Sequence, residues 1–334
     1  MLGHRMGATT EAQGFHGSGL WAVILGGSSG FGLATARRLS RAGLSIAIGH
    51  KDKPAFVETE LTPHFEFIRS QGVDLLTHNG NLAEDEERGA LMDAIEKRAG
   101  RGRIHLFLHS IAAGACRLVV DAPAASRRRE ALDGLAAALS EQGMTVSPDA
   151  LRRAVNAAFH DKGCDALYTL AESRIPYAES LLTDEDLART IGLMGYDYLL
   201  WGRELLARGL LARGARLVAL TSQGSTIAWR GYAAVSAAKA ALEAVCRAMA
   251  VELGPHGARA CIVQAGITDT PAGNAIPNFD LMKAQARLRN PSGRLTTTED
   301  VAGAIYGLCL PFFDWANGSI IRVDGGEAIA GSET

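Results

Sequence analysis

Residues 20–32 of this 334-residue chain read LWAVILGGSSGFG, an uninterrupted apolar run that passes directly into a glycine-rich turn. A short continuous apolar run is typical of a parallel strand covered on both faces, because each face meets the core. The residues that follow, Leu33 to Ala42, have helical character, and Gly43 ends them. These residues therefore predict a buried strand, a tight turn and a helix, in that order.

The same alternation continues along most of the chain. Further apolar runs predict strands at residues 44–49, 73–77, 104–108, 216–220, 258–263 and 319–323. Helical patterns lie between them at residues 55–70, 84–99, 184–212, 232–253 and 298–309. Strands that alternate with helices across short turns favour a parallel sheet with right-handed crossovers. We therefore expect an α/β fold, a Rossmann-type doubly wound parallel sheet of about seven strands.

Two regions depart from this pattern. Residues 1–19 show no periodicity and are interpreted as a flexible leader before a single domain over residues 20–334. Residues from about 116 to 180 hold no apolar run of sheet quality, but contain two expected helices, 125–141 and 148–159. Ser147 is the expected N-cap of the second helix, with Pro148 in its first position. The chain is thus interpreted as one domain with a helical insertion after the fourth strand.

Composition excludes several classes of function. The chain is 47% hydrophobic and 21% charged, with a net charge of −2, so it lacks the basic surplus of a nucleic-acid-binding protein. No apolar run is long enough to cross a membrane, and the first twenty residues do not resemble a secretory signal. The five cysteines and nine histidines show no metal-ligand spacing, so no metal and reduced thiols in the cytoplasm are expected.

The glycine-rich turn predicts a nucleotide site. Glycines let the backbone approach a pyrophosphate, and the helix that follows supplies free amides and a favourable dipole. Their spacing here is Gly26-x3-Gly30-x-Gly32, and the predicted cofactor-binding residues of this turn are Gly26, Ser28, Ser29, Gly30, Phe31 and Gly32.

The end of the second strand bears on the choice of cofactor. That position normally meets the adenosine ribose, where a basic residue pairs with a 2′-phosphate and an acidic one with a free 2′-hydroxyl. The sequence there is His50-Lys51-Asp52-Lys53. His50 and Lys51 favour NADPH, and Asp52 leaves NADH open.

Tyr232 and Lys239 are the candidate catalytic pair. They lie seven residues apart, so two helical turns place both side chains on one face of the expected helix. A lysine ammonium raises the acidity of a neighbouring tyrosine, and can also hold ribose hydroxyls. Ser222, just after the strand at 216–220, is a third candidate.

On these residues the chain resembles the short-chain dehydrogenase/reductase family over nearly its whole length outside the insertion. The motifs that carry the resemblance are Gly26-x3-Gly30-x-Gly32, Lys239, the turn Gln264-Ala265-Gly266-Ile267-Thr268-Asp269-Thr270 and the terminal Val323-Asp324-Gly325-Gly326. Ordinary members carry Tyr-x3-Lys, which would need a tyrosine at position 235, where this chain has Val235. The spacing Tyr232-x6-Lys239 is instead similar to the divergent enoyl-acyl-carrier-protein reductases.

Further segments resemble that branch. His109-Ser110-Ile111-Ala112 stands where ordinary members have Asn-Asn-Ala-Gly, and Gly192 occupies the position of their catalytic asparagine. Residues 265–294 resemble a mobile segment that covers the substrate. One residue departs from the branch, because Ser222 stands ten residues before Tyr232, where enoyl reductases carry a second tyrosine. Ser222 also lies thirteen residues before position 235, where ordinary members keep a catalytic serine.

The resemblance implies an NAD(P)H-dependent oxidoreductase that reduces the carbon–carbon double bond of an α,β-unsaturated acyl thioester. Tyr232 would stabilise the enolate oxygen, Lys239 would orient the nicotinamide ribose, and Ser222 would add a hydrogen bond. It further implies cofactor contacts from Asn81, Leu82, Ser110, Ile111, Lys239, Thr268 and Thr270. The acyl group would be carried by coenzyme A or by an acyl-carrier protein, and the protein would form a homotetramer or a homodimer.

Two alternatives stand beside this interpretation. One is an NADPH-dependent carbonyl or alcohol oxidoreductase of the ketoreductase type that uses Ser222 and Tyr232. The other is a catalytically silent dinucleotide-binding sensor, against which Tyr232 and Lys239 argue. The insertion is basic around residues 127–129, which suits either an acyl-carrier docking site or a solvated helix face. Because it follows the fourth strand, we expect it to act as a lid beside the substrate.

Overall fold

The computed structural model describes residues 14–121 and 127–331. Within them lies one sheet of seven strands, in the order β3-β2-β1-β4-β5-β6-β7, with every neighbouring pair parallel. The strands are β1 Trp21–Leu25, β2 Ser45–His50, β3 Leu75–Asn79, β4 Ile104–His109, β5 Leu211–Thr221, β6 Arg259–Ala265 and β7 Ile320–Val323. The strand order reverses between β1 and β4, and ligands of doubly wound sheets bind at such a reversal. The predicted α/β class and strand number are confirmed.

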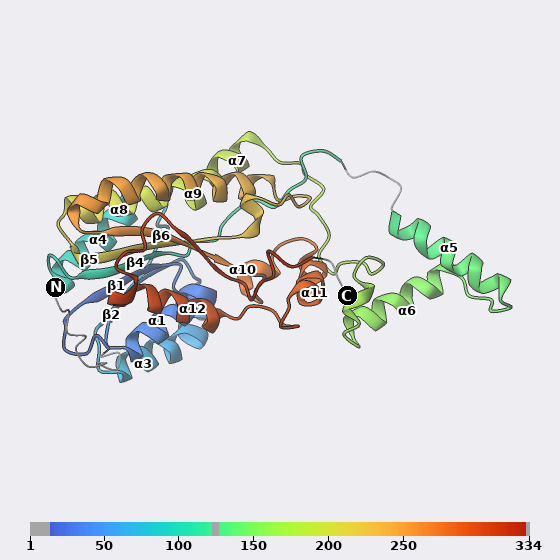
Figure 1. The fold of residues 1–334 in the computed structure, drawn as a ribbon, viewed down its shortest axis with the longest axis horizontal. Helices are drawn as coiled ribbons and strands as arrows, with labels where there is room; N and C mark the ends of the chain where they lie inside the picture. The colour runs from blue at the N-terminus through green and yellow to red at the C-terminus, as the bar shows by residue number, and fades with distance from the viewer. Residues whose placement is uncertain (1–13, 122–126, 332–334) are drawn as a thin grey trace, which may run out of the picture.

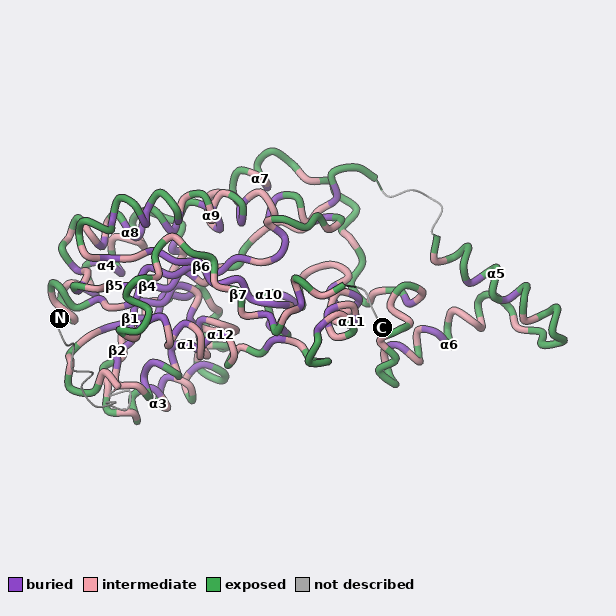
Figure 2. Tube along the Cα trace, in the orientation of Figure 1, coloured by how far each residue is buried: buried purple, intermediate pink, exposed green. Residues whose placement is uncertain are grey.

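Helices cover both faces of this sheet (Figure 1). On one face a core cluster joins inward residues of the strands to α4 Asp85–Ala99, α8 Asp197–Ala207 and α9 Ala233–Leu253. On the other face a second cluster joins the strands to α1 Gly30–Arg41, α3 Thr62–Ser70 and α12 Thr298–Leu308. Figure 2 shows this burial running along the strands. The continuous apolar runs in the sequence therefore follow from strands that are covered on both sides.

Some predicted helix boundaries are wrong. The helix expected over residues 184–212 is α7 Asp184–Ile191, a π-helical segment Gly192–Tyr196 and α8, which ends at Ala207. Gly209 has a φ of +65°, which stops the helix, and β5 begins two residues later. The helix expected over residues 55–70 is also interrupted, as α2 Pro54–Phe56, a π-helical segment Val57–Leu61 and α3.

The predicted leader is shorter than expected. Residues 1–13 lie outside the described residues, but residues 14–19 contact the body of the domain. The Phe15 backbone N–H donates to the Ala42 carbonyl, and the Phe15 ring lies 5.0 Å from the His105 ring, centroid to centroid. The interpretation of residues 14–19 as a flexible leader is therefore wrong, because an apolar side chain fixes them against the core.

The insertion is helical, as predicted. It contains α5 Arg127–Glu141 and α6 Pro148–His160, and the Ser147 side chain caps α6 by accepting from the Ala150 N–H at 3.2 Å. Both helices extend away from the sheet, and α6 returns towards α11 (Figure 1). A small core of its own joins the insertion to α11, with Leu132, Val155, Phe159 and Ala171 packed on Leu281 and Ala284.

The segment after β6 forms the other side of this contact. It contains α10 Pro271–Asn274 and α11 Phe279–Arg289, in the region where a substrate-covering segment is expected. Arg287 of α11 makes two hydrogen bonds of 2.6 Å to Asp165 of the insertion. The insertion and the predicted covering segment are therefore packed together. Among the described helices, none is long and apolar enough to span a bilayer.

Candidate active site

The turn after β1 brings backbone atoms close together. Gly26 has a φ of +75°, and a Cβ on it would lie 2.6 Å from the Ser110 carbonyl oxygen. A Cβ on Gly32 would lie 2.2 Å from the Gly26 carbonyl oxygen. In the described structure the Ser29 side chain makes no capping hydrogen bond to α1. The first-turn amides of α1 thus keep their capacity to bind an anion, which fits a dinucleotide pyrophosphate.

A cavity of about 1240 Å³ begins at this turn and follows the carboxyl ends of the strands. Every predicted site residue except Gly32 lines it: Gly26, Ser28, Ser29, Gly30, Phe31, His50, Lys51, Asn81, Leu82, Ser110, Ile111, Ser222, Tyr232, Lys239, Thr268 and Thr270. Gly32 does not line the cavity, but its lack of a side chain lets α1 approach the backbone of the turn at Gly26. The structure therefore brings the dispersed candidates into a single site.

At the β2 end of the cavity, His50 is not as free as the sequence suggested. His50 is buried, and its Nδ1 lies 2.9 Å from a carboxylate oxygen of Asp52. The Asn79 side chain fixes Asp52 further with two hydrogen bonds of 2.9 Å. It accepts from the Asp52 N–H and donates to the Asp52 carbonyl oxygen. The interpretation of His50 as a base available to a 2′-phosphate is therefore weakened, because a carboxylate already contacts it.

At the other end, β5 and α9 position the catalytic candidates. Tyr232 is the N-cap residue of α9, and Lys239 follows two turns later with its side chain buried. The Lys239 Nζ donates to the Leu220 carbonyl oxygen at 2.7 Å. Ser222 directly follows β5, and its hydroxyl accepts from the Gly224 N–H at 3.3 Å. Tyr232 stands just before the first residue of α9, and Tyr232 and Lys239 line the same cavity.

The electrostatic expectation for this pair is wrong. Burial raises the pKa of the Tyr232 hydroxyl to about 12, and a hydrogen bond with Ser222 only partly opposes that change. Burial also lowers the pKa of the Lys239 ammonium to about 8, against the opposing charge of Glu243. Burial is the largest cause of both shifts, so the acidity of Tyr232 is lowered rather than raised. Tyr232 is a neutral hydroxyl that can donate a hydrogen bond.

The wall near Tyr232 is mainly apolar. Its lining includes side chains from the π-helical segment, α9, α10 and α11, among them Leu193, Met194, Val235, Ile276, Phe279 and Met282. The Trp229 ring stands perpendicular to the Tyr232 ring at 5.9 Å between centroids. Cys116 also lies here, and burial raises its pKa to about 11, so its thiol is neutral rather than nucleophilic. This part of the cavity suits an apolar ligand.

The comparisons agree with this geometry. The family model described as enoyl-(acyl carrier protein) reductase matches residues 170–327. The chain is 36% identical over 123 residues to the NADH-dependent enoyl-acyl-carrier-protein reductase of Escherichia coli, over 37% of this chain and 47% of that protein. It is 38% identical over 126 residues to L-xylulose reductase of Bos taurus, over 37% of this chain and 51% of that one. These matches span about half the length of the two relatives.

A solved structure extends the likeness in fold to almost the whole chain. The NADH-dependent enoyl-acyl-carrier-protein reductase of Aquifex aeolicus superimposes with a TM-score of 0.67 at 22% identity, covering 95% of this chain and 98% of that one. Over residues 170–327 and in its fold, the chain is similar to the short-chain dehydrogenase/reductase superfamily. Within this superfamily it is similar to the enoyl-acyl-carrier-protein reductases.

Two features of the candidate site were not predicted from the sequence. The first is a buried network behind the loop after β6. The fully buried Glu327 carboxylate accepts from the Ile267 N–H, the Gln223 amide and the Arg289 guanidinium, each at 3.0 Å. This network fixes the loop that carries Thr268. Its members lie far apart in sequence and carry no motif that would join them.

The second feature is the contribution of the insertion to the cavity. Ile175, Pro176, Tyr177 and Ala178 line it beside α10 and α11. The insertion therefore lines the same cavity as the predicted site residues, although the sequence gave no reason to choose these four, and its expected action as a lid stays a prediction. Among the described residues, no cluster of histidine, cysteine, aspartate or glutamate could hold a metal ion.

Proposed function

We propose that this protein reduces the carbon–carbon double bond of an α,β-unsaturated acyl thioester. The observation that carries the proposal is the state of Tyr232. Its hydroxyl has a pKa of about 12 beside Ser222, at the apolar end of a cavity that begins at a dinucleotide-type turn. A neutral hydroxyl beside an apolar wall can donate a hydrogen bond to an oxygen on which charge develops.

A nicotinamide dinucleotide is the proposed cofactor, and when bound it would supply a hydride to the β-carbon. The glycine turn and the uncapped start of α1 would hold its pyrophosphate. The preference for NADPH rests on His50 and Lys51, and the His50–Asp52 contact weakens it. We therefore treat NADPH and NADH as two arms of every binding experiment.

The roles of the catalytic residues follow from where they are held. Tyr232 would donate a hydrogen bond to the thioester oxygen as it becomes an enolate oxygen, and Ser222 would supply a second donor. Lys239, charged below a pH of about 8, would add positive potential and hold a ribose hydroxyl. The apolar lining from α9, α10 and α11 would exclude water from the reacting carbons.

The second candidate function is reduction of a ketone. The presence of Ser222 beside Tyr232 in the cavity favours it, since that pair could polarise a carbonyl group. The likeness to L-xylulose reductase also supports it. Two residues count against it, because Gly192 offers no side chain for a proton relay and the buried Val235 replaces the tyrosine of ordinary members.

A substrate panel separates these functions. The purified full chain is mixed with NADPH or NADH and with 2-enoyl thioesters on coenzyme A and on acyl-carrier protein, then with 3-ketoacyl thioesters and ketoses. We expect dinucleotide oxidation with the enoyl thioesters and the loss of most of it in Tyr232→Phe. Turnover of ketones alone would replace the proposal with its alternative. Dinucleotide binding without turnover on any substrate would favour the sensor.

Partners and location are also proposals. The acyl thioester would be the substrate partner, on coenzyme A or on a carrier protein, in the cytoplasm. We propose self-association as a homotetramer or homodimer, for which light scattering on the purified chain at several concentrations is the test. A monomer at all concentrations would contradict it.

A further inference from the structure

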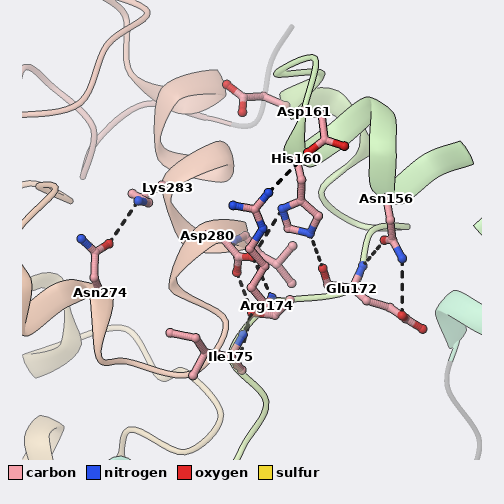
Figure 3. A network of polar contacts seen from close by, with 12 residues as sticks. Asn156, His160, Asp161, Glu172, Arg174, Ile175, Asn274, Asp280 and Lys283 are labelled. Atoms are coloured by element: carbon pink, nitrogen blue, oxygen red, sulfur yellow. Dashed lines mark hydrogen bonds and ion pairs between the residues drawn. The ribbon is translucent and has the colours of Figure 1, made fainter. Parts of the chain in front are cut away.

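Residues 173–178, the last part of the insertion, form a segment that we call the strap. One end of the strap is held by Asp280 of α11. The Asp280 carboxylate accepts from the Ser173 hydroxyl at 2.6 Å and from the Arg174 backbone N–H at 3.0 Å. Figure 3 shows these bonds between the strap and α11, with His160 of α6 beside them. Asp280 therefore joins the insertion to the segment after β6.

The other end of the strap reaches the start of α9. The Tyr177 hydroxyl donates to the Arg230 carbonyl oxygen at 2.9 Å. The Tyr177 ring lies against Gly231, where an added Cβ would be 2.5 Å from the ring carbon Cε1. Tyr232 is the next residue along the chain. The strap thus crosses the cavity from α11 to the backbone that carries the candidate catalytic hydroxyl.

The backbone at this point needs an external contact. Gly231 has a φ of +73°, and glycine populates positive and negative φ almost equally, so it does not fix the direction of the next residue by itself. Tyr232 has no side-chain hydrogen bond as the cap of α9 in the described structure, and its N–H donates to the Trp229 carbonyl at a long 3.2 Å. The Tyr232 carbonyl accepts from the Ser236 N–H of α9 at 2.9 Å, and Tyr177 adds a restraint on the other side, because it covers Gly231 and binds the carbonyl before it.

We propose that Tyr177 is a positioning residue for Tyr232, contributed to the active site by the insertion and held in place by Asp280. Ile175 and Pro176 extend the same strap along the cavity wall. The insertion would therefore act on the reaction as well as on the shape of the pocket. The kinetic part of this inference rests on the proposed function, whereas the structural part does not.

The structural test is hydrogen exchange on the full chain without substrate. Tyr177→Phe removes the hydroxyl and keeps the ring, and Tyr168→Phe, in the small core of the insertion, is the matched control. Losing one hydrogen bond of ordinary strength predicts exchange of the backbone amides of residues 229–236 that is about five- to tenfold faster. Asp280→Asn should give the same change there and at residues 173–178. Unchanged exchange at residues 229–236 in folded Tyr177→Phe would overturn the inference.

The kinetic test separates positioning from binding. With an enoyl thioester as substrate, Tyr177→Phe should lower kcat about tenfold and leave KM for the dinucleotide unchanged, because a misplaced donor weakens the transition state more than the ground state. Tyr168→Phe should leave both constants unchanged. A loosened segment with an unchanged kcat would refute the positioning role. If the wild-type chain reduces no enoyl thioester, the proposed function fails. Hydrogen exchange alone then tests whether Tyr177 restrains the backbone that carries Tyr232.

Discussion

Replacing Gly32 by alanine should weaken dinucleotide binding while leaving the fold in place. A Cβ at residue 32 would lie 2.2 Å from the carbonyl oxygen and 2.9 Å from the carbonyl carbon of Gly26. Since an ordinary carbon–oxygen contact is about 3.3 Å or longer, the turn must move by about 1 Å. Both atoms are backbone, so no side-chain rotation can relieve the contact. Overpacking of this kind costs about 1–3 kcal/mol, which converts to an affinity about 5- to 150-fold weaker.

Calorimetric titration with NADH and with NADPH measures this loss, and thermal unfolding checks the fold. Gly89→Ala in α4 is the matched control, because an added Cβ there has no neighbour within 4 Å. We expect the control to bind as the wild type does, with equal or slightly higher thermal stability. A folded Gly32→Ala protein that binds both dinucleotides with wild-type affinity would show that this turn does not hold the pyrophosphate.

Three further predictions follow from buried charged or ionisable groups. Because Lys239 has a pKa of about 8, dinucleotide affinity should fall as the pH rises through 8, and Lys239→Met should bind weakly at every pH in calorimetric titration. Burial raises the pKa of Cys246 and Cys309 to about 12. Below pH 9 the thiols are protonated in the folded and in the unfolded chain, so their contribution to stability is complete. As the pH rises from 9 to 12, the unfolded thiols lose their protons first and this contribution is lost. In urea unfolding, the free energy of unfolding should fall by up to about 1.4 kcal/mol per pH unit for each buried thiol. Cys309→Ala removes one of these thiols and should therefore reduce this slope. Glu327→Gln should destabilise the chain by about 2–4 kcal/mol in chemical unfolding, since it leaves the partly buried Arg289 guanidinium without its carboxylate, whereas the exposed Glu58→Gln should not.

Each of these predictions has a clear contrary result. Dinucleotide affinity that is constant from pH 7 to pH 9 would contradict the lowered pKa of Lys239. A free energy of unfolding that rises above pH 9, or a Cys309→Ala protein with an unchanged slope, would contradict the buried neutral thiols. Equal stability of Glu327→Gln and Glu58→Gln would show that the network behind the β6 loop does not stabilise the fold.

Most of the fold could be predicted because it rests on local pattern. Each strand is covered on both faces, so its apolar run is continuous in the sequence, and glycine marks the turns between elements. Boundaries failed where a single backbone conformation decided them, as at Gly209, whose positive φ ends α8 early. Phe15 is a similar case, since one apolar side chain attaches residues that otherwise show no pattern.

The candidate site also contains some residues that local sequence patterns predict and some contacts that they do not. Residues in short motifs, such as the glycine turn and the pair Tyr232 and Lys239, could be placed from spacing alone. Contacts between distant segments could not, because nothing local joins Glu327 to Ile267 or Tyr177 to Gly231. The pKa of Tyr232 could not be predicted either, since it depends on burial, and burial is a property of the folded chain.

The destination of the hydride tests the central claim most directly. The full chain is given a nicotinamide dinucleotide that carries deuterium at the transferable position, together with a 2-enoyl-coenzyme A, and the product is examined by NMR. We predict deuterium on the β-carbon of a saturated thioester, with the amount formed per unit time about 10²- to 10³-fold lower in Tyr232→Phe, as when one donor to a developing oxyanion is removed. A second reaction contains a 3-ketoacyl thioester in place of the enoyl substrate. Deuterium on the carbinol carbon of its product, with the enoyl substrate of the first reaction recovered unlabelled and unreduced, would contradict the account.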